Sequence, residues 1–224
     1  MCLAHLAPQA LEEFLAGLGP GSYIDARGTT IYPDLLDRLL DAVKDGDSKR
    51  VLGQASFHHA RFEGGAGFDG AHFENRAAFS GAHIKGHARF CDARFDYGAL
   101  FNDVHFEGGA WFQGAHFKLA AVFGDSYFKD VAWFYGTHFE GPAGFYSTHF
   151  EDSAEFPCAR FSGSSSFSIT ATGQVNLQRG AAGHLGAPWE GAEAGGRVHP
   201  SAWGVWGRGH RRGGHAPGQA ARLG

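Results

Sequence analysis

Phenylalanine recurs in a fixed register through the middle of this chain, and this register constrains the fold more than any other feature. From Phe57 to Phe167 a core position follows every five or six residues in strict alternation, and all of these positions except Ile84 are Phe. The residue two places before each core position is small or β-branched, and most often Ala. Such regular spacing indicates an internal structural repeat. The core side chains that we expect to point inward are Phe62, Phe68, Phe73, Phe79, Phe90, Phe95, Phe101, Phe106, Phe112, Phe117, Phe123, Phe128, Phe134, Phe139, Phe145, Phe150, Phe156 and Phe161.

The spacing inside each unit predicts a very short strand. Side chains two residues apart lie on the same face of an extended strand, so the small residue and the Phe both point inward. The segments between units, such as FEGGA, FDGA and FEGPA, are rich in turn-forming residues. An amphipathic helix would instead need apolar residues at a period of about 3.6. The sequence therefore predicts short strands joined by corners, with each coil hydrogen-bonded to coils about 4.8 Å away.

The motifs FHHARF, FDGAHF, FSGAHI and FQGAHF resemble those of the pentapeptide-repeat family, which have a large apolar central residue and Ala two places before it. This chain departs from the plain form by one added residue in every second unit, as in a subgroup of that family. The resemblance covers about half of the chain and implies an all-β, right-handed quadrilateral β-solenoid. Four faces would give 22 residues per coil and about five coils over residues 57–167. A flattened, two-faced coil of half that length is the alternative.

The N-terminal region, residues 1–54, is expected to form a helical cap, because an open solenoid needs a cover over its apolar cross-section. The segment PQALEEFLAGLG predicts a short helix that ends at Gly17 and Gly19, and IDARGTTI predicts a short strand or turn. Pro33 suits the first turn of a second helix, which we expect to pack over the first Phe layer. A separate partner-binding helix is the alternative. The apolar face of this helix carries Leu35, Leu36, Leu39, Leu40 and Val43.

The C-terminal segment breaks the pattern. Thr172 stands where the register predicts the next core residue, and residues 171–224 contain no Phe and no Lys. Their Gly, Ala, Arg, His and Trp content predicts a disordered low-complexity tail after a repeat domain at residues 55–170. The alternatives are a basic segment that contacts nucleic acid or a membrane, and an out-of-frame stretch that replaced further coils.

Composition excludes several classes of protein. The net charge is only −4, so no strong electrostatic partner is indicated for the chain as a whole. Three cysteines, Cys2, Cys91 and Cys158, argue against a secreted disulfide scaffold, and the last two should be outward and inert. The N-terminal MCLAHLAPQALEEF lacks the basic region of a signal peptide, and no apolar run reaches the ~18 residues of a membrane helix. We therefore expect a cytoplasmic protein without a transmembrane segment.

Catalytic and cofactor motifs are missing from the sequence, which has no P-loop, HExxH, G-x-S-x-G or cysteine pair at metal spacing. In a four-faced coil, the residues just before the Phe of each short unit form two outward columns, with His83 over His105 and His116 over His138. Two stacked His are a weak metal site, because a metal needs more ligands and supporting contacts. We therefore predict a ladder of exposed polar residues, with no metal ligand and no cofactor. Stacked imidazoles should resist double protonation, so acid should loosen the solenoid.

These features predict a non-catalytic module that binds another protein or a second copy of itself. Trp111 and Trp133 each precede the Phe of a long unit and are one four-faced coil apart, so they should stack on neighbouring coils. Tyr135 should point outward nearby, and Leu100 and Val122 should lie at the same height on a second face. Exposed aromatic clusters mark interaction sites. The alternative is that a corner loop or the C-terminal tail covers them.

The family resemblance implies a second function, which is mimicry of duplex DNA and binding to DNA gyrase or another type II topoisomerase. Such mimicry needs a dense acidic surface. Residues 55–170 contain 13 Asp and Glu against 8 Lys and Arg, a small excess for a duplex mimic, so this function ranks second. A membrane-associated form, as in some members of the family, ranks third. Direct nucleic-acid binding and enzyme activity are not expected.

Overall fold

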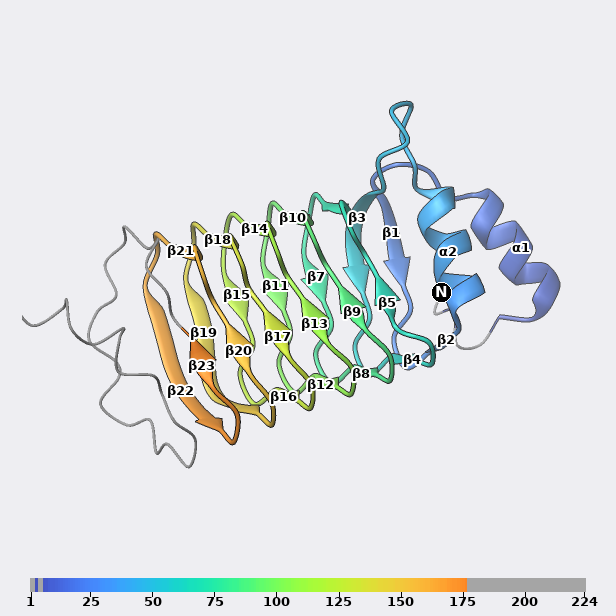
Figure 1. Cartoon of the computed structure of the whole chain (residues 1–224). Helices are drawn as coiled ribbons and strands as arrows, with labels where there is room; N and C mark the ends of the chain where they lie inside the picture. Colours follow the sequence, from blue (N-terminus) through green and yellow to red (C-terminus); the bar gives the residue numbers. More distant parts are fainter. Residues whose placement is uncertain (1–2, 4–5, 177–224) are drawn as a thin grey trace, which may run out of the picture.

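The computed structural model describes residue 3 and residues 6–176, and these form a β-solenoid with two short helices at its N-terminal end (Figure 1). The named strands pair in parallel and stack in about six turns. This confirms the predicted solenoid. The five coils expected over residues 57–167 are extended at both ends, so the total is larger than predicted.

The strands form four columns, one for each face of the coil, and the chain visits the faces in the order 1, 2, 3, 4. Face 1 consists of β2 (Thr30–Ile31), β4 (Arg61–Phe62), β8 (His83–Ile84), β12 (His105–Phe106) and β16 (Tyr127–Phe128). Face 2 consists of β5 (Ala66–Gly67), β9 (Ala88–Arg89), β13 (Ala110–Trp111), β17 (Ala132–Trp133), β20 (Ala154–Glu155) and β23 (Val175–Asn176).

The other two faces complete the coil. Face 3 consists of β6 (His72–Phe73), β10 (Arg94–Phe95), β14 (His116–Phe117), β18 (His138–Phe139) and β21 (Arg160–Phe161). Face 4 contains β7 (Ala77–Ala78), β11 (Ala99–Leu100), β15 (Ala121–Val122) and the end of β1 (Ser22–Asp25), which starts on face 3. Three longer strands turn a corner between adjacent faces, namely β3 (Val51–Ser56), β19 (Ala143–Phe150) and β22 (Ser165–Ala171).

The register settles the length of the coil. His116 pairs with His138 on face 3, and Trp111 pairs with Trp133 on face 2, so each residue meets its partner after the chain has visited all four faces. The shorter, two-faced coil is therefore wrong. Because the chain visits four faces in turn, face 1 lies opposite face 3, and face 2 lies opposite face 4.

Phenylalanine ladders fill the interior. All eighteen core Phe predicted to point inward are buried, and Phe156 and Phe161 are the most accessible of them at 3%. Along face 2, Phe90 stacks on Phe112 with ring centroids 5.0 Å apart and planes 2° from parallel. Across the interior, Phe112 meets Phe123 of face 4 edge to face, with centroids 5.3 Å apart. The buried neighbours of these rings are mostly Ala, because little space remains beside a ladder packed at this spacing.

Every second corner has the geometry of a type II turn. The residue two places after a long-unit Phe has positive φ, as in Gly114 at +66° and Asp92 at +55°. The amide of the next residue bonds back to the Phe carbonyl, as Ala115 N does to Phe112 O at 3.0 Å. Type II turns require a left-handed residue at this position, which explains the run of Gly, Asp and Ser there.

The N-terminal region contributes strands as well as helices. The helices α1 (Pro8–Ala16) and α2 (Pro33–Ala42) begin and end close to the predicted positions. However, β1 and β2 pair with β3 and β4, so the parallel ladder begins at Ser22, well before the expected boundary at residue 55. Helix α2 packs against β5, and its Leu36, Leu39, Leu40 and Val43 are buried in the same cluster as Phe57. Leu35 is only partly buried.

The solenoid continues after Phe167, although its register shifts by one residue. Strand β22 lacks the corner residue that β19 has at Ser147, so the pairing shifts between Tyr146 and Thr148. Ala171, rather than Thr172, then stands beside Phe150. Buried Ile169, Ala171 and Val175 continue the interior, and β23 pairs with β20. The expected tail boundary at residue 171 is therefore too early, and the rest of that predicted tail, residues 177–224, lies outside the described residues.

Candidate functional site

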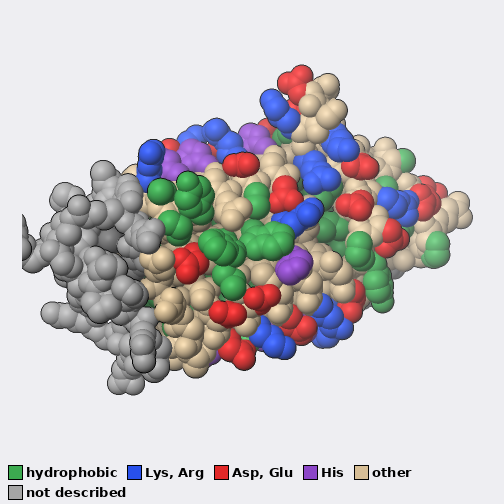
Figure 2. Space-filling view, viewed as in Figure 1, with side chains coloured by type: hydrophobic (Ala, Val, Ile, Leu, Met, Phe, Trp, Pro, Cys, Tyr) green, Lys and Arg blue, Asp and Glu red, His purple; other side chains and the backbone are tan. Residues whose placement is uncertain are grey.

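Two indoles lie on neighbouring coils of face 2. Trp111 in β13 and Trp133 in β17 are paired in register, and both side chains are half-buried. His87 stacks on Trp111 with ring centroids 4.7 Å apart. Figure 2 shows hydrophobic side chains grouped in the middle of the surface over these strands, with charged side chains around them. Tyr135, at the corner that follows Phe134, is 52% exposed. We call Trp111, Trp133 and Tyr135 the tryptophan patch.

Charged residues flank the two indoles in the same column. Arg89, one coil before Trp111, pairs with Asp69 at 2.9 Å between Nε and Oδ2. Glu155 lies one coil after Trp133, and burial raises the pKa of its carboxyl group despite a hydrogen bond with Asn176. The patch is therefore an aromatic surface with a polar border, as in many protein interfaces.

Leu100 and Val122 do not extend this patch. They lie in β11 and β15 on face 4, half-buried and paired with each other, on the opposite side of the solenoid. Tyr146, which is 40% exposed, packs over Gly124 and accepts a hydrogen bond at 2.7 Å from Asn102 Nδ2. Sequence reasoning missed Tyr146, although it follows Phe145 as Tyr135 follows Phe134. Leu100, Val122 and Tyr146 form a second patch, which we call the face 4 patch.

Faces 1 and 3 carry the ladders of polar rings. On face 1, His83 stacks on His105 at 5.0 Å, and Tyr127 lies 4.8 Å beyond His105. On face 3, His116 stacks on His138, also at 5.0 Å and with planes 8° from parallel. The structure thus places both pairs as the predicted four-faced coil requires.

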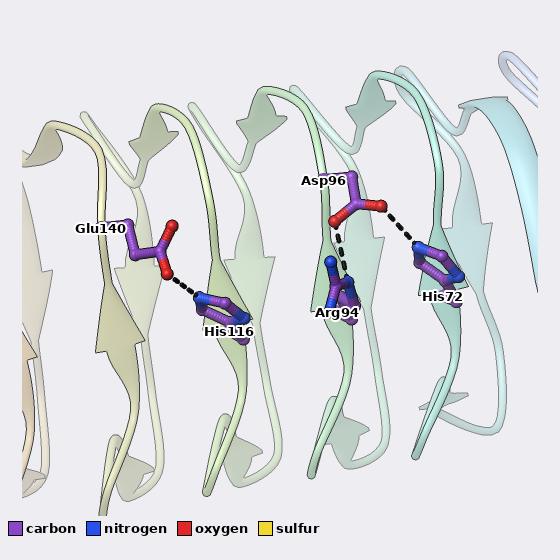
Figure 3. Close-up of polar contacts among 5 residues, drawn as sticks. All are labelled: His72, Arg94, Asp96, His116 and Glu140. Carbon is purple, nitrogen blue, oxygen red and sulfur yellow. Dashed lines mark hydrogen bonds and ion pairs between the residues drawn. The ribbon is translucent and has the colours of Figure 1, made fainter.

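Carboxylates that sequence reasoning missed complete these ladders. Glu107 Oε1 lies 2.7 Å from His83 Nε2. On face 3, Glu140 Oε1 lies 2.9 Å from His116 Nε2, as Figure 3 shows. Each Glu stands two residues after the second His of its pair, so it points outward from the same strand. The motif HFE occurs at both places and could have indicated these His–Glu contacts. Recognising them required knowing that the Glu side chain reaches back to the His of the preceding coil.

Electrostatics distinguish the members of the ladders. Burial, together with the nearby charge of His83, lowers the pKa of His105, so its imidazole is neutral near pH 7. Burial opposes ionisation of Asp96, but hydrogen bonds from His72 and Arg94 outweigh it and lower the pKa of that carboxyl group. Outside the ladders, burial and the Asp69 carboxylate raise the pKa of the Cys91 thiol and so disfavour its reactive thiolate form.

The fold defines a class, the parallel β-solenoids built from short repeated units with four faces. A family model described as pentapeptide repeats (9 copies) matches residues 50–94, from the start of β3 into β10. Residues 50–94 therefore match the pentapeptide-repeat family, and the Phe register of the chain continues well beyond the matched segment. The search of curated proteins gave no match, and neither did the search of solved structures. Within the described residues, neither helix is long and apolar enough to cross a membrane.

Proposed function

We propose that the chain is a non-catalytic protein-interaction module whose tryptophan patch contacts another protein or a second copy of the chain. The observation that carries this proposal is the in-register pair Trp111 and Trp133 on one face, between Arg89 and Glu155. Indoles held by a rigid ladder lose little conformational freedom on binding, and Trp is enriched at the energetic centres of interfaces. A cytoplasmic location belongs to the same proposal, because Cys91 and Cys158 are free, as is usual in a reducing compartment.

The pairing of surface charges supports this function over mimicry of DNA. A duplex mimic needs rows of unpaired negative charge to imitate phosphates. Here Glu63 pairs with Lys85 at 2.7 Å, Asp69 pairs with Arg89, and Asp96 bonds both Arg94 and a histidine. Several acidic side chains of the repeat region are therefore paired with neighbouring cations and do not form rows of unpaired negative charge. DNA gyrase binding and membrane association remain the second and third candidates.

A pair of double variants tests the proposed surface. Trp111→Ser with Trp133→Ser should leave the fold intact, because neither indole fills the core, and should abolish self-association or partner capture. Leu100→Ser with Val122→Ser, on the opposite face, is the matched control. Sedimentation velocity measures self-association, and cross-linked capture followed by mass spectrometry measures partner binding. Circular dichroism checks the fold of each variant.

The outcomes of this test separate the two parts of the proposal. If the tryptophan variant unfolds, the indoles belong to the core and the outward assignment fails. If it folds and keeps its oligomeric state and every partner, the functional assignment fails. A DNA supercoiling assay with micromolar protein tests the second candidate, and we expect no inhibition of gyrase.

A further inference from the structure

Two clusters of potential metal ligands share one sequence pattern. Each consists of a His, a second His one coil later in the same column, and a Glu two places after the second His. The clusters are His83, His105 and Glu107 on face 1, and His116, His138 and Glu140 on face 3. In each cluster the three ligand atoms lie within 4.8 Å of one another. The same arrangement therefore occurs on opposite sides of the solenoid.

The ladder holds these ligands in place before any ion binds. The pairs His83 with His105, and His116 with His138, are in direct register on adjacent parallel strands. Both imidazole pairs have ring centroids 5.0 Å apart. Nitrogen and oxygen ligands bind zinc at about 2.0–2.2 Å, which puts them roughly 3.3 Å from each other around the ion. The His83–Glu107 and His116–Glu140 contacts, at 2.7 and 2.9 Å, are slightly shorter than that value, and the remaining ligand atoms lie within 4.8 Å, so modest side-chain adjustments would bring all three ligands around one ion.

The ligand types suit a borderline metal ion. Two imidazole nitrogens and one carboxylate oxygen are a donor set for Zn²⁺, Ni²⁺ or Cu²⁺, whereas Mg²⁺ and Ca²⁺ prefer oxygen ligands alone. A metal ion binds the neutral form of each imidazole, so binding should weaken as the pH falls. The neighbouring Lys85 is paired with Glu63, which reduces its repulsion of a cation.

We propose that each His–His–Glu cluster binds one divalent transition-metal ion through both imidazoles and the carboxylate. This site is independent of the tryptophan patch, which lies on face 2. The feature that distinguishes the clusters from the rest of the ladder is the second His, not the carboxylate. At His72, Asp96 makes the same backward contact at 2.8 Å, but Arg94 occupies the place of the second His (Figure 3). The cationic guanidinium has no lone pair to offer, so this third position should not bind metal.

Calorimetric titration of the full chain with Zn²⁺ near neutral pH is the first measurement. The variants are His105→Asn, His138→Asn and the two combined, and His72→Asn is the matched control. We expect each single variant to lose one bound ion and the double variant to lose two, while His72→Asn keeps both. The affinity at a damaged cluster should fall by more than the roughly 10–100-fold that loss of an outer-shell partner costs.

Titration with Co²⁺ gives a second readout, because its visible absorption reports nitrogen and oxygen ligation directly. The Co²⁺ spectrum should halve in each single variant and vanish in the double variant, after subtraction of any binding by the four His of residues 177–224, which all variants retain. Circular dichroism shows whether each variant is folded. If His105→Asn is not, Glu107→Gln replaces it, and if His138→Asn is not, Glu140→Gln replaces it. If the folded double variant binds as many ions as the original chain with equal affinity, or if the original chain binds none, the proposal is wrong.

Discussion

Phe112 and Phe134 lie face to face on neighbouring coils, with ring centroids 5.0 Å apart and planes 2° from parallel. Phe112 also stacks on Phe90 of the preceding coil and is fully buried. Phe112→Ala should therefore lower the free energy of unfolding by about 3–5 kcal/mol, since a middle coil cannot collapse around the cavity. Urea denaturation followed by circular dichroism measures this loss. Tyr135→Ala, at an exposed corner, is the control, and a loss below about 1 kcal/mol for Phe112→Ala would contradict the inward register.

The corner turns predict opposite effects at two equivalent positions. Gly136 and Cys158 occupy the same corner of successive coils, with φ of +62° and +58°. A Cβ on Gly136 would meet no atom within 4 Å, so Gly136→Ala isolates the backbone strain and should cost about 1 kcal/mol. Cys158→Gly should remove strain and stabilise the chain by roughly 0.5 kcal/mol, after the added flexibility of the unfolded state. Thermal denaturation measures the midpoint of each variant. If neither midpoint differed from that of the original chain, the left-handed conformation of this corner would be contradicted.

Buried hydroxyl groups predict a smaller effect. Thr137 and Thr148 stand where most units have Ala, and their Oγ1 atoms donate to the carbonyls of Phe112 at 2.6 Å and Phe123 at 2.9 Å. Thr137→Ala should cost about 1 kcal/mol, because one hydrogen bond is lost while the Phe112 carbonyl keeps the amide of Ala115. Chemical denaturation measures the difference, and Thr148→Ala should behave alike. A cost above about 3 kcal/mol would mean that the methyl group, not the hydroxyl, matters there.

Acid should destabilise the solenoid through His105. Burial, the charge of His83 and that of Lys129 lower its folded pKa below the ordinary 6.5, while Glu107 opposes them and the Tyr127 ring covers its other side. The unfolded chain therefore binds the proton more tightly than the folded chain. Stability is retained above pH 6.5 and falls as the pH drops from 6.5 toward the lowered folded pKa.

Denaturation midpoints measured between pH 7 and 5 test this dependence. His58, whose pKa is lowered by burial and then by Arg76, should add to it in the same direction. His105→Gln should flatten the pH profile, because the group with the lowered pKa is then absent. A profile that is flat in the original chain would rule out the effect.

The interior of this protein could be predicted from its sequence because the chemistry repeats there. Each Phe and the Ala before it obey one local rule, and Phe112 needs no knowledge of distant residues to be placed inward. Glu107 and Glu140 could not be found in this way. Each touches a His 24 residues earlier, so their role depends on the coil length and on which way a long side chain leans.

The last coil shows a second limit. The repeat was expected to end after Phe167 because counting with an unbroken coil length places polar Thr172 at the next core position, but one missing corner residue moved Ala171 into that place. Composition offered no sign of the shift, since Ala171 stands beside Phe150 while the larger Ile169 and Val175 stand beside Thr148 and Ala154. Leu100 and Val122 were likewise predicted at the correct level along the solenoid axis. Predicting that they lie opposite the tryptophans required knowing the order of the four faces.

The interior repeats with every half coil, whereas the outer surface returns to the same side only after a full coil. An in-frame deletion of one full coil would leave each face in line. A deletion of half a coil would keep Phe and Ala at the buried positions but turn the remainder by half a revolution, carrying Trp133 into the column of Leu100 and His138 into that of His83. Relatives selected only for folding could therefore differ in length by odd numbers of half coils, while relatives that bind through one side should differ by whole coils.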